Sequence, residues 1–128
     1  MKILLKQVTI ADPQSKHNGL TKDILIEDGI IVSIESNISQ KADQTIECTN
    51  AFVSGGWVDV FSNFCDPGFE FKETLQSGIA AAAAGGYTRV LVMGDTKPVT
   101  DNKAQVAYIH AAGNNAQVTL HPIGAITK

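Results

Sequence analysis

The chain has 128 residues, a length typical of about one domain. Hydrophobic residues make up 44% of it and charged residues 18%, so a packed core is expected and disorder is not. The 10 basic and 13 acidic residues give a formal net charge of −3, which gives no reason to expect nucleic acid or an anionic membrane surface as a partner.

The N-terminus and the cysteines indicate a cytoplasmic protein. The sequence contains no run of about 18 apolar residues, so we expect no segment that spans a bilayer. The first residues, M-K-I-L-L-K-Q, contain an apolar run that is too short for the core of a signal peptide. They are more typical of a strand. Cys48 and Cys65 form no C-x-x-C pair, and we take both as reduced thiols.

Residues 1–54 have the pattern of short antiparallel strands. Lys2–Ile10 is rich in strand formers, and Gln44–Cys48 is a further short strand. Asp23–Ile34 holds two apolar runs around Asp28-Gly29, and Asp-Gly at such a place predicts a hairpin, because a tight primed turn needs positive φ.

From residue 55 onward, apolar strands alternate with helical patterns. This alternation predicts right-handed βαβ units and a parallel sheet, and the continuous apolar strands suggest a sheet buried on both faces. The sheet edges would remain unpaired, so we infer the front part of a larger (β/α) protein, since a complete eight-fold barrel needs about 250 residues. The predicted strands are 58–61, 88–93 and 118–123, and the predicted helices are 71–84 and 101–112.

Residues that favour helix termini mark the ends of both predicted helices. Gly85-Gly86 stops the first helix, and Asn114-Asn115 closes the second. Thr100 is a plausible N-cap of the second helix, and Asp101-Asn102 suits the dipole of its first turn. Helical spacing predicts that the second helix packs through an apolar set, Ala104, Ala107, Tyr108 and Ala111.

Three stretches between about residues 50 and 128 are distinctive: G-G-W-V-D-V-F-S-N-F-C-D-P-G-F-E-F-K-E-T, A-A-A-A-G-G-Y-T-R-V-L-V-M-G-D-T-K-P-V-T-D-N and H-P-I-G-A-I-T-K. Together they resemble the amino-terminal part of a dihydroorotase, a cyclic amidohydrolase of the amidohydrolase superfamily. The resemblance implies an α/β fold in which residues 55–128 form the first β/α units of a metal-carrying (β/α)₈ TIM-type barrel. Residues 1–54 would be the amino-terminal part of a β-sandwich domain assembled from both chain ends.

The first barrel strand departs from the family pattern Asp-x-His-x-His-x-Arg-x-Pro-Gly, in which the histidines bind metal and the arginine holds the substrate carboxylate. Asp59 and Pro67-Gly68 are retained. Phe61 and Asn63 occupy the histidine positions, and Cys65 occupies the arginine position.

The second strand departs as well. The family pattern there is Met-Pro-Asn-Thr-x-Pro, and its asparagine also contacts the substrate carboxylate. The asparagine position holds Asp95, which would repel a carboxylate, whereas Pro98, Asp101 and Asn102 are retained.

These changes predict that no residue of the site is catalytic. Opening a cyclic amide at neutral pH needs a water whose pKa is lowered by a bound metal. Two imidazoles at i and i+2 on a strand can hold one ion, but Phe61 offers no ligand atom and Asn63 only a neutral amide, a poor ligand for zinc. We therefore expect no cofactor, and no zinc at positions where active family members carry it.

Simpler roles suit most of the remaining candidates. Phe61 and Phe64 are expected to fill the core or the mouth of the site, and Cys65 to be an inert thiol instead of a nucleophile or a metal ligand. We give little weight to a hard-cation site and expect Asp59 to point away from Phe61 and Asn63 or to bond the backbone. The residues of that cation site would be Asp59, Asp66 and Asp95. We take the three histidines, His17, His110 and His121, as structural or solvated.

The favoured interpretation is a dihydroorotase-like protein of pyrimidine biosynthesis without catalysis. The resemblance implies a structural or regulatory partner of aspartate transcarbamoylase, and another copy or further chain would cover the open sheet edges. One alternative is an active cyclic amidohydrolase whose metal site is completed by residues beyond 128. Another is a binding or interaction module that keeps only the first strands of the barrel.

Overall fold

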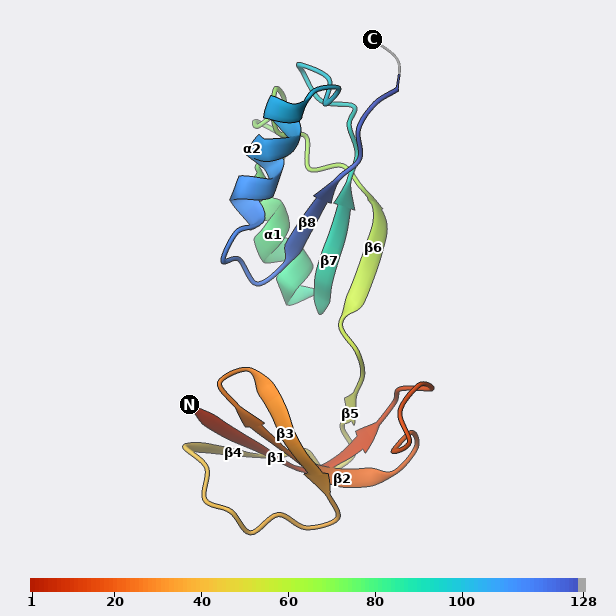
Figure 1. The fold of residues 1–128 in the computed structure, drawn as a ribbon, viewed down its shortest axis with the longest axis vertical. Coiled ribbons are helices and arrows are strands. Elements are labelled where there is room, and N and C mark those ends of the chain that lie inside the picture. The colour runs from red at the N-terminus through yellow and green to blue at the C-terminus, as the bar shows by residue number, and fades with distance from the viewer. Residues whose placement is uncertain (127–128) are drawn as a thin grey trace. The chain divides into compact units, whose positions relative to one another are not determined.

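The computed structural model describes residues 1–126 and divides the chain into two compact units, Met1–Gly55 and Gly56–Lys128 (Figure 1). The first unit is a β-sheet, and the second combines a sheet with two helices, so the chain has a mixed α/β fold. Among the described residues, no helix is long and apolar enough to cross a membrane.

The first unit is one five-stranded sheet in which β1 is central. The order is β3-β2-β1-β4, and β5 also pairs with β1. The predicted hairpin between β2 and β3 is confirmed, because Asp28 and Gly29 both have positive φ, 49° and 81°. The strands are β1 (Lys2–Ile10), β2 (Thr21–Glu27), β3 (Ile30–Glu35), β4 (Gln44–Glu47) and β5 (Phe52–Val53).

The prediction that residues 1–54 pair only in antiparallel fashion is wrong. β4 and β5 both run parallel to β1, with Ile3 opposite Gln44 and Thr9 opposite Phe52. The segment 36–43 leads from β3, at one side of the sheet, to β4 on the far side of β1. Strand direction is set by such a connection, and the pattern of a short strand does not encode it.

A buried carboxylate fixes the centre of this unit. Asp23 is fully buried and accepts hydrogen bonds from the backbone nitrogens of Gln7, at 3.0 Å, and Ile38, at 2.9 Å. Lys6 Nζ lies 2.7 Å from the same carboxylate. Burial alone would raise the pKa of Asp23, but the bonds from Lys6 and the two amides outweigh it and lower that pKa.

The second unit is a parallel sheet, β6-β7-β8, with both helices on one face (Figure 1). The predicted alternation of strands and helices is confirmed. The elements are β6 (Trp57–Ser62), α1 (Leu75–Ala84), β7 (Tyr87–Val92), α2 (Lys103–Gly113) and β8 (Thr119–Pro122), and the core between sheet and helices contains Phe64, Leu75, Val90, Val92, Ile109, Val118 and Leu120.

The other face of this sheet is not covered by the described residues. Val58 and Val60 of β6 are 48% and 66% exposed. Alternate residues of a strand share a face, so these two belong to the face opposite the helices. The expectation of a sheet buried on both faces therefore does not hold within residues 1–126.

Helix α1 begins four residues later than predicted. Thr74 is its N-cap, since the Thr74 side chain accepts from the backbone nitrogen of Ser77 and the Ser77 hydroxyl accepts from the Thr74 nitrogen. Its end is as predicted: Gly85 is the C-cap, and Gly86 follows with φ 81°.

Helix α2 corrects two predictions about its N-terminus. Its N-cap is Asn102, whose side chain accepts from the nitrogens of Ala104 and Gln105, whereas Thr100 is buried and its hydroxyl lies 2.9 Å from that of Thr96. The first turn holds no acidic residue, so Asp101 does not act there on the helix dipole.

The predicted packing face of α2 is also wrong. Ile109 is fully buried, with Val106 and Ala112 half-buried beside it. Alanine is small enough to suit either face, so the pattern of alanines and Tyr108 does not identify the buried one. The residues predicted to pack, Ala104, Ala107, Tyr108 and Ala111, are all exposed.

We predict that Asp23→Ala lowers the free energy of unfolding by about 3 kcal/mol, because it removes the charged partner of Lys6 and the acceptor of the Gln7 and Ile38 backbone nitrogens. Urea unfolding measures the loss, and amide hydrogen exchange at Gln7 and Ile38 locates it. Since the folded-state pKa is lowered, this stabilisation is present above the ordinary value of 3.8 and is lost as the pH falls below it.

The matched control is Asp43→Ala, which removes an exposed carboxylate that accepts from the backbone nitrogen of Lys2 at 2.7 Å. It should cost less than about 1 kcal/mol. Equal losses for the two variants would show that Asp23 has no special role in this sheet.

Candidate functional site

Two loops meet at the carboxyl ends of β6 and β7. The backbone nitrogen of Lys97 donates to the carbonyl oxygen of Pro67 at 2.9 Å. Gly68 has φ 104°, and a Cβ there would lie 2.0 Å from the Lys97 carbonyl oxygen, so only glycine fits. The Asp66–Pro67 and Lys97–Pro98 peptide bonds are cis. Three residues predicted as retained, Pro67, Gly68 and Pro98, thus lie where the loops touch.

Asp66 joins these loops to both helices. Only 3% of it is exposed, and its carboxylate accepts from the backbone nitrogen of Leu75 at 3.1 Å and from the Tyr108 hydroxyl at 2.9 Å. The bond to Asp66 raises the pKa of Tyr108, and burial and the charges of Asp66 and Glu70 raise it further. Sequence reasoning considered Asp66 only as a cation ligand, because the family pattern leaves the position before Pro67-Gly68 unspecified.

The three aspartates considered as a cation site do not converge. Asp59 Oδ1 accepts from the backbone nitrogen of Phe61 at 3.0 Å, as one of its two predicted roles required. Asp59 lines a cavity of about 240 Å³ together with residues of α1, Asp66 is engaged by Leu75 and Tyr108, and Asp95 faces other pockets. Among residues 1–126, no three His, Cys, Asp or Glu side chains are grouped so that they could hold a metal ion.

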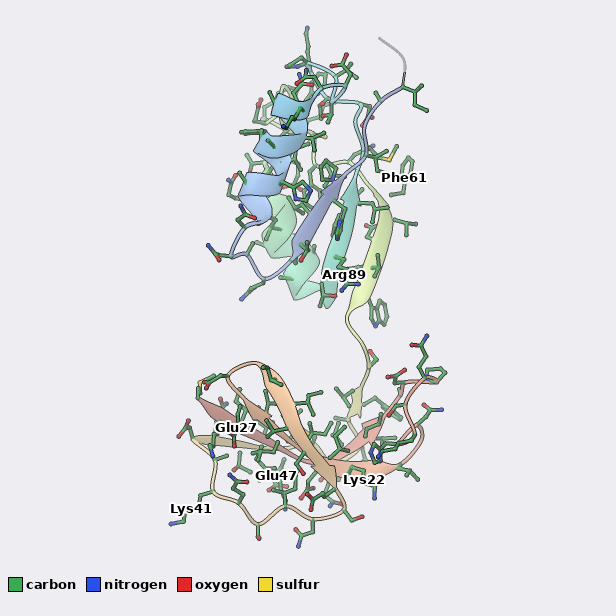
Figure 2. The ribbon with its side chains drawn as sticks, in the orientation of Figure 1. Lys22, Glu27, Lys41, Glu47, Phe61 and Arg89 are labelled. Carbon is green, nitrogen blue, oxygen red and sulfur yellow. The ribbon has the colours of Figure 1, made fainter. Side chains whose placement is uncertain are left out.

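The two predicted filling residues behave differently. Phe64 is a core residue, and it packs so closely on α1 that a Cβ at Gly78 would lie 2.7 Å from its ring. Phe61 is 66% exposed, so it does not fill the core within the described residues, and the other expected role, filling the mouth of the site, stays a prediction. Figure 2 shows Phe61 extending from the carboxyl end of β6, away from the two helices.

One pocket brings together three of the four changed family positions. Its volume is about 300 Å³, and Asn63, Cys65 and Asp95 line it with Phe69 and Lys72. The pocket therefore holds the positions of one histidine, the arginine and the asparagine of the family pattern. Phe61 is not part of its lining.

The pocket wall combines a constrained backbone with a stacked cation. Cys65 has φ 61°, a left-handed conformation uncommon for a residue other than glycine, and its carbonyl oxygen accepts from the Phe69 nitrogen at 2.8 Å. Lys72 Nζ lies 5.2 Å and 5.7 Å from the ring centroids of Phe69 and Phe71. Sequence reasoning missed Lys72, because neither its spacing nor its type distinguishes it from a solvated lysine.

A second, more apolar pocket of about 500 Å³ shares Asp95 and lies at the ends of β7 and β8. The other retained positions lie apart from both pockets: Asn102 caps α2 and donates to Asp101 at 3.1 Å. None of the three histidines lines either of these two pockets. His110 and His121 are exposed, and His17 is half-buried in its polar loop. The larger pocket is lined by Met93, Gly94, Asp95, Val99, Ile123, Gly124 and Ala125.

The fold is similar to that of solved amidohydrolase-superfamily proteins. L-hydantoinase (dihydropyrimidinase) from Arthrobacter aurescens superposes with a TM-score of 0.75 at 26% identity, covering 95% of this chain and 27% of that one. A family model described as Dihydro-orotase-like matches residues 50–128, and the chain belongs to this dihydroorotase-like family.

Curated relatives agree with this assignment. The chain is 42% identical over 127 residues to the dihydroorotase of Acetivibrio thermocellus, covering 98% of this chain, and 40% identical over 131 residues to that of Syntrophotalea carbinolica, covering all of it. It spans 30% of the length of each of these relatives.

We predict that the Tyr108 phenol titrates above its ordinary pKa of 10.0 and that Asp66→Asn lowers this pKa, because the charged acceptor is removed. Ultraviolet absorbance at alkaline pH, taken as the difference from a Tyr108→Phe variant so that only this phenol contributes, measures the shift. Because the folded-state pKa is raised, the linked stability is complete below the ordinary value and declines as the pH rises through the folded-state pKa.

The control substitution is Asp101→Asn, which removes an exposed carboxylate from the loop between β7 and α2. It should leave the Tyr108 titration unchanged. A Tyr108 pKa that does not respond to Asp66→Asn would contradict the proposed bond.

Proposed function

We propose that this protein is a non-catalytic dihydroorotase homologue of pyrimidine biosynthesis that acts as a structural or regulatory partner of aspartate transcarbamoylase, in the cytoplasm. The observation that carries the proposal is the pair Phe61 and Asn63 at the metal-binding positions of the family. Phe61 projects from the strand end, 66% exposed and without a ligand atom.

The donor set at this strand does not fit a zinc ion. Asn63 offers a neutral amide oxygen, the carboxylate of Asp59 is bonded to the Phe61 nitrogen, and Cys65 Sγ lies 3.7 Å from the Asn63 carbonyl oxygen. Zinc favours imidazole and thiolate ligands in tetrahedral sets. A single thiol and an amide do not make such a set, so no step of ring opening is assigned to a metal here.

The substrate side of the pocket has also lost its fit to a carboxylate. The family's arginine would supply two parallel hydrogen bonds to it, and Cys65 supplies none of comparable strength. Asp95 adds a negative charge to the same pocket. Both substrate binding and activation of the attacking water are therefore impaired. Loss of both functions supports an inactive protein more than a slower enzyme.

The architecture suits this role. We infer that β6, β7 and β8 begin a (β/α)₈ barrel and that residues 1–54 are part of a β-sandwich, as in the family. The uncovered sheet face with Val58 and Val60 supports the barrel inference, because further strands would bury it. The alternative is an active hydrolase whose metal ligands all lie beyond residue 128. The retained family residues Asp59, Pro67 and Gly68 are the observation that favours this alternative.

We predict that the intact protein does not hydrolyse dihydroorotate with added zinc, and that combining Phe61→His, Asn63→His, Cys65→Arg and Asp95→Asn does not restore turnover. Residues that orient metal ligands matter nearly as much as the ligands, so replacing the ligands alone does not rebuild the site. Hydrolysis assays and elemental analysis after dialysis provide the two measurements.

Turnover by the unmodified protein would support the active alternative. Turnover by the fourfold variant alone would confine the loss of function to these positions. A variant with only Phe61→His is the matched control for a change in folding, and its circular dichroism should equal that of the unmodified protein.

We predict that the intact protein forms a complex with the aspartate transcarbamoylase of the same organism. The reason is that a retained scaffold without catalytic groups is suited to an assembly role. Sedimentation velocity of the mixture should reveal a species larger than either protein alone. Independent sedimentation of the two proteins at micromolar concentration would rule out this partner.

A further inference from the structure

We propose that the pocket lined by Asn63, Cys65, Phe69, Lys72 and Asp95 binds a small zwitterion, a molecule that carries both a carboxylate and an ammonium group. This inference rests on the proposed function, because it assigns a ligand class to the site that has lost catalysis. The corresponding site of active family members is expected to bind a substrate carboxylate, whereas the proposed ligand carries a positive charge as well.

The two charged side chains of the pocket, Lys72 and Asp95, have opposite signs and form no ion pair within the described residues. Within residues 1–126, Asp95 also accepts no hydrogen bond. The side-chain amide of Asn63 is likewise without a partner in the described chain. A cation, an anion and an amide that converge on one cavity are the kind of polar groups that orient a ligand.

Lys72 is held at the pocket by its aromatic neighbours. Its ammonium lies near the rings of both Phe69 and Phe71, which are 6.4 Å apart and meet edge to face. A cation over ring faces loses part of its freedom before any ligand arrives, so less entropy is lost on binding. Phe69 also gives the pocket an apolar wall.

Charge complementarity selects the zwitterion. A carboxylate that pairs with Lys72 enters the field of Asp95, and an amine that pairs with Asp95 enters the field of Lys72. A ligand with both groups satisfies each charge and leaves neither like-charge contact. The volume of about 300 Å³ lies at the small end of ligand pockets, which limits the ligand to the size of an amino acid.

The test is isothermal titration calorimetry of the intact protein with five probes. Three are zwitterions with increasing separation of charge, L-norvaline, 4-aminobutyrate and 6-aminohexanoate, and two carry one charge, pentanoate and pentylamine. We expect at least one zwitterion to bind about tenfold or more tightly than both singly charged probes. No heat from any zwitterion up to about 10 mM, or tighter binding of pentanoate, would overturn the proposal.

Two variants with matched controls test the residues. Asp95→Asn should weaken the zwitterion about tenfold and strengthen pentanoate, and Lys72→Met should weaken the zwitterion and strengthen pentylamine. Glu47→Gln and Lys41→Met change exposed charges in the other unit and should have no effect (Figure 2). A structural role for Asp95 or Lys72 would weaken all probes alike, without this exchange of preference.

The outcome is separate from that of the proposed function. Hydrolysis of dihydroorotate by the unmodified protein would overturn the loss of catalysis whatever the calorimetry gives. Absence of both hydrolysis and zwitterion binding would leave the proposed function standing and overturn only the ligand assignment.

Discussion

The buried carboxylate of Asp66 is the contact on which the second unit depends. It accepts from the backbone nitrogen that opens α1 and from the hydroxyl of Tyr108 on α2, so one side chain fixes both helices relative to the loop after β6. A carboxylate at a helix N-terminus also meets the positive end of the helix dipole. Since a buried charge is costly unless its oxygens are satisfied, this arrangement permits little change at position 66.

The neighbouring residues carry that constraint to the second loop. Pro67 accepts from the Lys97 nitrogen, and Gly68 leaves room for the Lys97 carbonyl oxygen. In the loop after β7, Thr100 is buried, its hydroxyl meets that of Thr96, and its carbonyl oxygen accepts from Ala125. The backbone around the pocket is thus held by residues other than those that would perform chemistry, which explains how the loop geometry and the reactive groups can vary independently.

Sequence reasoning found the elements whose patterns are local. The Asp28-Gly29 hairpin and the Gly85-Gly86 helix stop follow from backbone preferences of the residues themselves. It failed where a choice depends on partners distant in the chain: β4 and β5 run parallel to β1 because of their connections, and α2 packs through Ile109. Tyr108, counted as apolar, instead presents its hydroxyl to Asp66, forty-two residues away.

The residues of the candidate site were likewise predicted where a sequence motif marks them and missed where only the fold places them. The motif located Asn63, Cys65 and Asp95, and the fold brings these three into one pocket. It did not identify Lys72, whose position is set by the rings of Phe69 and Phe71 and not by any pattern. Relative to the family, arginine to cysteine removes one positive charge and asparagine to aspartate adds one negative charge, so the pocket becomes more negative by two charges. Exposed charges contribute little to folding stability, but they decide which ligands can enter, so these replacements change recognition at little cost to the fold.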